Sequence, residues 1–203
     1  MLSADSITEL HDRLTALWHA QPHAQPEADP AQPDPFLTLV ARQHRANFDL
    51  WHIEDEARRP GATAAKIAAI KRSVDRTNQL RNDLAEQLDE ALLQHLAARG
   101  LPNSAAPLHS ESPGLIVDRH SILALKIYHT REESLRAGAP QGHAQRNRAR
   151  LALLEEQRSD LAECLDRLWS ETLAGARRFK LYRQLKMYND PALNPAIYGR
   201  RRS

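Results

Sequence analysis

The sequence is poor in the residues and patterns that form β-sheets. Aromatic residues make up only 5% of the chain, and no Asn-Gly or Asp-Gly pair lies between alternating apolar residues, so hairpin signals are missing. Seven glycines stand against 12 prolines, and the stretches between the prolines are rich in Ala, Leu, Glu, Arg and Gln. This composition favours helices, and we expect an all-α protein.

Cysteine is represented by one residue, Cys164, which excludes an internal disulfide and suits a reducing compartment. Its position beside a row of leucines predicts a packing role rather than a nucleophile. No apolar run approaches the roughly 20 residues that a membrane-spanning helix needs. The segment Met1–Asp5 also lacks the basic and apolar regions of a secretion signal. We therefore expect a cytoplasmic protein without a transmembrane segment.

The net charge of +2 conceals a basic C-terminal segment. Residues 176–203 hold eight basic residues and one acid, Asp190, whereas the rest of the chain is net negative. Such a segment favours an anionic partner, which can be a phosphate, a nucleic acid or an anionic membrane surface. The alternative is a solvated helix face followed by an arginine-rich end.

Apolar residues recur with helical periodicity in five segments. These segments predict helices at residues 6–20, 35–59, 63–99, 112–135 and 144–174. A shorter basic helix is expected from Arg177 to Asn189, followed by an extended tail. The sequence thus divides into an N-terminal helix with a proline-rich loop (1–34), an antiparallel bundle of four long helices (35–175) and a basic C-terminal segment (176–203). The segment from 112 to 135 is apolar nearly all round, which predicts a central, buried helix.

Polar residues occupy helix faces that are expected to point into this bundle. On the second predicted helix, His44, Asn47, Asp55 and Arg58 lie on the same side as Trp51. Burying such groups without partners costs roughly 1–3 kcal/mol each, so they need partners or a ligand. We predict a partly buried, net positive cleft that binds an anionic, phosphate-bearing ligand. The candidate ligand-binding residues are Asn47, Trp51, Asp55, Arg58, Asn78, Arg81, Asp118, Arg119, Lys126, Arg183 and Lys186.

The same residues allow a purely structural interpretation. Arg81 with Asp55, and Arg58 with Asp89, are candidates for buried ion pairs that only fix the register of the helices. His44 by itself suits a hydrogen-bonded core histidine better than a ligand. His52 has carboxylates three and four residues further along, Asp55 and Glu56, and this spacing suits either a metal site on one helix face or ordinary exposed charge pairs.

No strong catalytic motif is present: GxxxxGK[ST], HExxH, GxSxG and CxxC are all missing. Glu54 and Asp55 on one predicted helix, with Glu86 and Asp89 on the next, resemble the paired acids by which all-α nucleotide pyrophosphohydrolases hold Mg²⁺. The first pair departs from the E-x-x-E arrangement of those enzymes.

Longer strings carry a second resemblance. They are residues 47–58 (NFDLWHIEDEAR), 78–83 (NQLRND), 111–119 (ESPGLIVDR), 121–129 (SILALKIYH) and 182–191 (YRQLKMYNDP). Together they make the chain, from about Pro35 to Tyr198, similar to a bacterial family with a domain of unknown function, DUF4254. His120 departs from the pattern, which has an apolar residue there, and we expect its side chain to reach the surface. The resemblance implies a place beside glycosyltransferases of lipopolysaccharide assembly and assigns no reaction.

Three functions follow as hypotheses. The first is an accessory or binding protein of envelope polysaccharide assembly, which recognises a phosphorylated or nucleotide-linked sugar or a glycosyltransferase. The second is a Mg²⁺-dependent pyrophosphohydrolase of nucleotides or nucleotide sugars. The third is a nucleic-acid-binding module that uses Arg177–Arg202; the lack of a recognition helix and the acidic remainder of the chain argue against it.

Overall fold

The computed structural model describes residues 2–27, 34–185 and 192–195, and its regular structure in these ranges is entirely helical. The helices are α1 (Ala4–Ala20), α2 (Pro35–Ala57), α3 (Ala64–Ala97), α4 (Pro113–Leu135) and α5 (His143–Leu173). No strand occurs in the described residues, where one isolated bridge joins Leu108 and Arg178. The predicted all-α class is confirmed, and each of the five periodic segments coincides with one of these helices.

Local capping explains where three of the helices begin. The Ser3 side chain accepts a hydrogen bond from the backbone N–H of Ser6 at the start of α1. The Asp34 carboxylate accepts from two backbone N–H groups of α2, with Pro35 in the first turn. The Thr63 side chain accepts from the N–H of Lys66 at the start of α3. These contacts satisfy donors that have no partner within the first turn of a helix.

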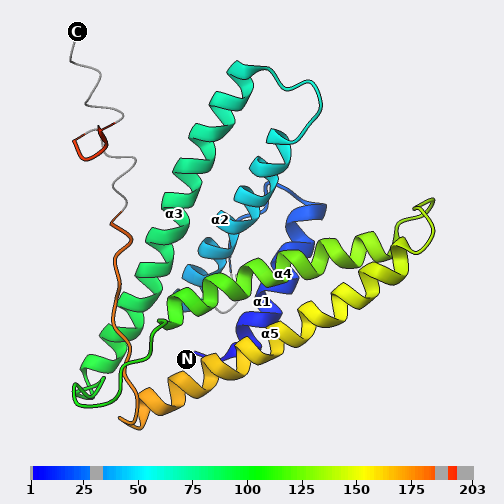
Figure 1. The fold of residues 1–203 in the computed structure, drawn as a ribbon. Helices are drawn as coiled ribbons and strands as arrows, with labels where there is room; N and C mark the ends of the chain where they lie inside the picture. Colours follow the sequence, from blue (N-terminus) through cyan, green and yellow to red (C-terminus); the bar gives the residue numbers. More distant parts are fainter. Residues whose placement is uncertain (1, 28–33, 186–191, 196–203) are drawn as a thin grey trace.

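The helices form two hairpins and a single crossing helix (Figure 1). The first hairpin consists of α2 and α3 and the second of α4 and α5, and their tips point in different directions. Helix α1 packs against α2, α4 and α5, and α4 contacts all four other helices. The central position predicted for α4 from its apolar surface is therefore observed.

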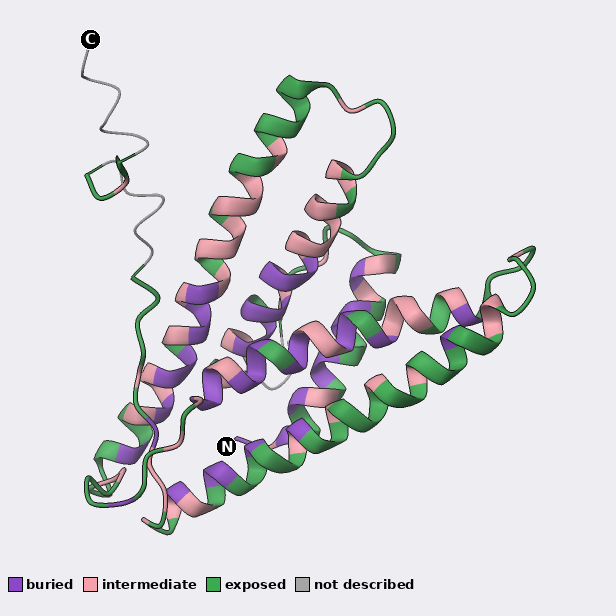
Figure 2. Ribbon diagram, in the orientation of Figure 1, coloured by how far each residue is buried: buried purple, intermediate pink, exposed green. Residues whose placement is uncertain are grey.

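The core lies where α1, α2 and α4 cross, and both hairpin tips are largely exposed (Figure 2). Trp18 of α1 packs edge-to-face on Phe48 of α2, with 5.3 Å between ring centroids. Leu165 and Leu168 of α5 are buried in the same cluster. None of the described helices has the combination of length and apolar character that a bilayer crossing requires.

The prediction of a basic helix from Arg177 to Asn189 is wrong for residues 177–185, the part of this range that the structure describes. Residues 177–185 are extended and run beside α3 (Figure 1), whereas residues 186–189 lie outside the described residues. Instead of hydrogen bonds within a helix, the backbone of this segment forms hydrogen bonds with the loop before α4. The N–H of Arg178 donates to Pro107 O, and the N–H of His109 donates to Arg178 O at 2.7 Å. Phe179 is fully buried, which fixes this segment against the rest of the molecule.

Candidate functional site

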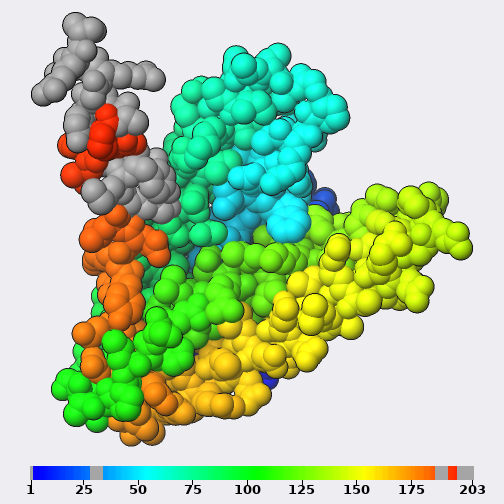
Figure 3. All heavy atoms as spheres, viewed as in Figure 1, coloured from blue at the N-terminus to red at the C-terminus, as the bar shows by residue number. Residues whose placement is uncertain are grey.

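A polar cleft lies between α2, α3 and α4, in the angle where the two hairpins separate. Its cavity measures about 370 Å³, within the range of small-molecule sites. The lining residues are Asn47, Leu50, Trp51, Glu54, Asp55, Arg58, Arg81, Ile122 and Leu125. The molecular surface is hollowed between the tips of the two hairpins (Figure 3). The cleft therefore brings together Asn47, Trp51, Asp55, Arg58 and Arg81 of the predicted ligand-binding set.

Beneath the cleft, a buried carboxylate links three helices. Asp118 Oδ1 of α4 accepts hydrogen bonds from Gln43 Nε2 at 2.6 Å and from Asn47 Nδ2 at 3.0 Å, both on α2. Arg81 Nε of α3 lies 3.6 Å from the same oxygen, at ion-pair distance. Burial raises the pKa of Asp118, and Arg81 and the two amide donors oppose that shift. Sequence reasoning found Asp118, Asn47 and Arg81 from their helix faces and missed Gln43.

The rim of the cleft is formed by exposed charges on the last turns of α2. Arg58 pairs with Glu54 at 3.3 Å and donates to the Glu54 carbonyl, and its side chain is 67% exposed. The ion pairs considered for Arg81 with Asp55, and for Arg58 with Asp89, are both wrong. Arg81 pairs with Asp118 and Arg58 with Glu54, so no ion pair between described residues bridges the mouth of the cleft.

The cleft is not net positive, which corrects the prediction from sequence. Arg58 and Arg81 are balanced by Glu54 and Asp55 on its walls, and Asp118 lies underneath. The error has a geometric cause. Helix α4 contacts all four other helices. Its polar residues are divided between two sides: Asp118 faces α2 and α3, whereas Arg119 and Lys126 face α5. A helix wheel does not show which side of a helix faces which neighbour.

Three further predicted cations lie away from the cleft. Arg119 and Lys126 line a separate groove between α4 and α5. There, Arg119 Nη1 donates to both carboxylate oxygens of Glu111, at 3.0 and 2.8 Å. Cys164 lines the same groove and is exposed, so the packing role predicted for it is wrong. Arg183 pairs with Glu86 and with a second α3 acid.

Asn78 and Lys186 are the last two members of the predicted set. Asn78 is half-buried on α3 and is not among the residues that line the cavity. Lys186 lies outside the described residues.

The four acids proposed to hold Mg²⁺ do not assemble. Glu54 and Asp55 line the cleft, but Glu86 accepts hydrogen bonds from Arg183 and from the backbone N–H of Gln184. Asp89 is buried and accepts the Gly114 N–H at 2.7 Å, where it caps the first turn of α4. Burial raises the pKa of Asp89 to about 6. Its carboxylate therefore has a structural role at the contact between α3 and α4.

A buried network of histidines lies where α1, α2 and α4 meet. It consists of His11, His44 and His120. His44 is a hydrogen-bonded core histidine, as predicted: its Nδ1 lies 2.7 Å from Ser121 Oγ and its Nε2 lies 2.9 Å from Thr15 Oγ1. The expectation that His120 reaches the surface is wrong, because its ring is fully buried between His11 and a threonine hydroxyl of α1. Burial lowers the pKa of His44 to about 3 and that of His120 to about 4.

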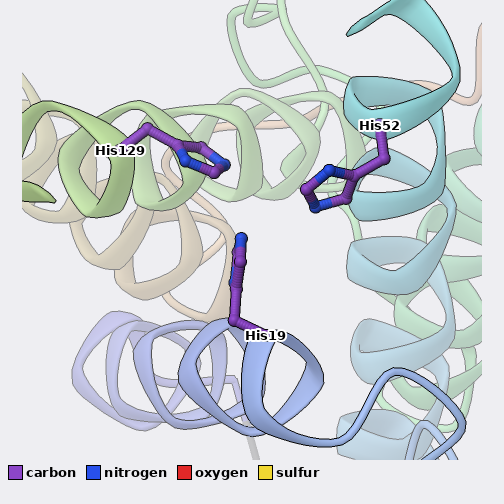
Figure 4. Close-up of side chains that lie close together, drawn as sticks. All are labelled: His19, His52 and His129. Atoms are coloured by element: carbon purple, nitrogen blue, oxygen red, sulfur yellow. The ribbon is translucent and has the colours of Figure 1, made fainter. Parts of the chain in front are cut away.

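A second histidine cluster, which sequence reasoning did not assemble, lies beside the cleft. His19 of α1, His52 of α2 and His129 of α4 each present one ring nitrogen, and these nitrogens all lie within 4.8 Å of one another (Figure 4). Trp51, which lines the cleft, stacks on His129 with 4.9 Å between ring centroids and 10° between ring planes. The cluster and the cleft therefore share a wall.

Comparison of the sequence with known protein families identifies one family to which the chain is similar. The sequence profile of a family described as "Protein of unknown function (DUF4254)" matches residues 37–181. This range includes all of α3, α4 and α5 and nearly all of α2, and hence every residue that lines the cleft. No curated protein and no solved structure matches the chain significantly.

Proposed function

We propose that this chain, which belongs to the DUF4254 family, binds a phosphorylated or nucleotide-linked sugar in the cleft between α2, α3 and α4. One observation carries the proposal. Arg81 lines the wall of an open cleft beside Trp51 and Asn47, with its Nε turned to the Asp118 carboxylate at 3.6 Å. A guanidinium has five N–H donors, and the donors that Asp118 does not engage can bind a ligand oxygen.

The chemistry of the walls suits a sugar with one phosphate better than a polyanion. His129 covers one face of Trp51, and the rest of the indole borders the cleft, where it offers an apolar surface to a sugar ring. Glu54 and Asp55 can accept hydrogen bonds from sugar hydroxyl groups. Arg58, exposed at the rim, has the planar donor set that binds phosphate oxygens in pairs. The balanced charge of the walls disfavours nucleic acid, whose affinity depends on many uncompensated cations.

The cellular role in this proposal is that of an accessory protein in envelope polysaccharide assembly. The resemblance of the family strings implies a context beside glycosyltransferases, whose donors are nucleotide-linked sugars. A protein that holds such a donor, or its phosphorylated product, would act together with one of these enzymes. The paired acids expected for a pyrophosphohydrolase are separated here, since Asp89 is engaged at the start of α4. Binding is therefore favoured over hydrolysis by those acids.

Replacement of Arg58 by methionine is expected to weaken binding of a nucleotide-linked sugar by roughly 10-fold to 100-fold, the equivalent of losing one or two charge-assisted hydrogen bonds. The free energy of unfolding should change by less than about 0.5 kcal/mol, because Arg58 forms only an exposed pair on its own helix. Isothermal titration calorimetry with UDP- and GDP-linked sugars measures the first quantity, and urea denaturation measures the second.

Arg59→Met is the matched control. Arg59 is the next residue, has a 68% exposed side chain and pairs with Glu56, and it does not line the cleft. Its replacement should leave the affinity unchanged. Equal affinities of the parent, Arg58→Met and Arg59→Met proteins would show that the ligand does not bind at this rim.

A further inference from the structure

We propose that His19, His52 and His129 bind one divalent transition-metal ion of the Zn²⁺ class and leave one coordination position open. The three side chains come from three different helices and converge on one space (Figure 4). This inference does not depend on the identity of the ligand in the neighbouring cleft.

The spacing of the nitrogens is close to that of a metal site. Zn²⁺ binds histidine nitrogens at about 2.0–2.1 Å in tetrahedral geometry, so three such nitrogens lie about 3.3 Å apart. In this structure the three nitrogens lie within 4.8 Å of one another. Closing this gap requires the nitrogens to approach by about 1.5 Å at most.

On His19 and His129, hydrogen bonds already select the ring nitrogen that would bind the metal. His19 Nδ1 lies 2.7 Å from the Thr15 carbonyl oxygen, and His129 Nδ1 lies 3.1 Å from Glu132 Oε2. Both oxygens are acceptors here, so each Nδ1 carries the proton and each Nε2 presents a lone pair. The Nε2 atoms of His19 and His129 are buried and have no hydrogen-bond partner. Histidine ligands of metals are held in this way by a carbonyl or carboxylate on the other nitrogen.

Aromatic packing holds the rings in place. Tyr128 stacks on His19, with 4.2 Å between centroids and 20° between ring planes, and Trp51 stacks on His129. Phe48 meets the edges of His19 and His52. Rings that are fixed before the ion arrives lose little conformational entropy on binding it, and this favours affinity.

The surrounding charges favour a cation. Asp55 acts electrostatically on both His52 and His129, Asp49 acts on His52, and Glu132 acts on His129. The nearby Arg45 is paired with Asp49 at 2.8 Å.

Cavities adjoin the histidine cluster on two sides, so a fourth ligand need not come from the protein. His19 and His52 line a cavity of about 580 Å³ on one side, and Trp51 and Asp55 line the cleft on the other. Three histidine ligands with an open fourth position are the arrangement of catalytic zinc sites, where a bound water has a pKa near 7. Structural zinc sites, by contrast, have four protein ligands. We therefore infer an exchangeable site that a small molecule can reach.

The test uses the full chain after removal of metals by a chelator, titrated with Co²⁺ alone and Zn²⁺ alone. We expect one Co²⁺ per chain with the intense visible absorption of a tetrahedral ion, and Zn²⁺ should displace it. His52→Gln and His129→Gln should each lower the affinity by roughly 100-fold or more. Glu132→Gln, which removes only the support of His129, should lower it by about 10-fold to 100-fold.

His23→Gln is the control, because His23 is an exposed histidine in the loop after α1 and is not part of the cluster. Circular dichroism of every variant checks the fold, and Glu132→Gln leaves all three rings in place if one of the histidine variants does not fold. Weak octahedral Co²⁺ binding without fixed stoichiometry would overturn the proposal. Affinity that is equally insensitive to His52→Gln, Glu132→Gln and His23→Gln would also overturn it.

Discussion

Lowering the pH from 7 to 5 is expected to remove about 3 kcal/mol or more from the free energy of unfolding. His44 and His120 have folded-state pKa values of about 3 and about 4, below the value of 6.5 in an unfolded chain. Between pH 6.5 and these values the unfolded state binds protons that the folded state does not, so stability is present above pH 6.5 and is lost as the pH falls. Each of these two histidines contributes a loss of roughly 2 kcal/mol between pH 7 and pH 5.

Other groups facing this network change the total. His11 has a pKa lowered well below its usual value by burial and by the two neighbouring histidines, so it adds to the loss. Arg158 also disfavours protonation, and it is held against the network by its pair with Asp12. Asp89, with a raised pKa of about 6, binds a proton in the folded state and offsets about 1 kcal/mol.

Urea denaturation at pH 7, 6 and 5, with a chelator present, measures this loss. His120→Leu should reduce the difference between pH 7 and pH 5 by about 2 kcal/mol, because one buried proton acceptor is removed. An unfolding free energy that is constant over this range would mean that water or a rearrangement accommodates the protonated rings. That result would contradict the closed packing of α1 on α2 and α4.

Replacement of Gly114 by alanine is expected to cost about 3 kcal/mol or more of unfolding free energy. A Cβ at this position would lie 2.2 Å from the carbonyl oxygen of Ala85 and 3.0 Å from the Asp89 carboxyl group. Both neighbours belong to α3, and Asp89 is itself fixed by the Gly114 N–H. Forcing an extra carbon into such a contact shifts backbone and typically costs about 1–3 kcal/mol, with loss of the hydrogen bond in addition.

Gly61→Ala separates this steric effect from ordinary glycine strain. Gly61 has φ of +80° and no atom within 4 Å of its potential Cβ, so its replacement should cost only the roughly 1–2 kcal/mol of a left-handed alanine. Thermal and urea unfolding of both variants gives the comparison. If Gly114→Ala were as stable as Gly61→Ala, the close contact of α3 with α4 would be incorrect.

The helices could be predicted because their signals are local. Periodic apolar residues, caps such as Thr63 and breaks such as Gly61 lie within the segment that they define. Residues 177–185, predicted as helix, are not helical because their conformation depends on distant partners. Arg178 bonds to the loop before α4, and Arg183 bonds to α3. No pattern within residues 177–189 reports those contacts.

The cleft could be predicted in part for the same reason. Asn47, Trp51, Asp55 and Arg58 share one face of a single helix, and a helix wheel places them together. Choosing their neighbours required knowledge of which helices pack against that face. Lys126 shows the resulting error, because it lies on the side of α4 that faces α5.

The histidine cluster could not be derived from spacing. His52 was a candidate metal ligand because carboxylates follow it at helical intervals, but its partners in the cluster come from α1 and α4. His120 shows the converse case, since its burial depends on Thr8 and His11, more than 100 positions away along the chain. Polar residues that meet across helices leave no periodic signal in either partner.

The melting temperature of the full chain with a nucleotide-linked sugar is the most direct measurement of ligand binding in the cleft. A ligand that binds only the folded state raises stability in proportion to the logarithm of its concentration, by about 2.7 kcal/mol at 100 times the dissociation constant. We predict such a rise with nucleotide-linked or phosphorylated sugars in the parent and in Arg59→Met. The rise should be much smaller in Arg58→Met and absent with unphosphorylated sugars. A melting temperature that no phosphorylated or nucleotide-linked sugar raises, at millimolar concentration and with or without Zn²⁺, would contradict the proposed function.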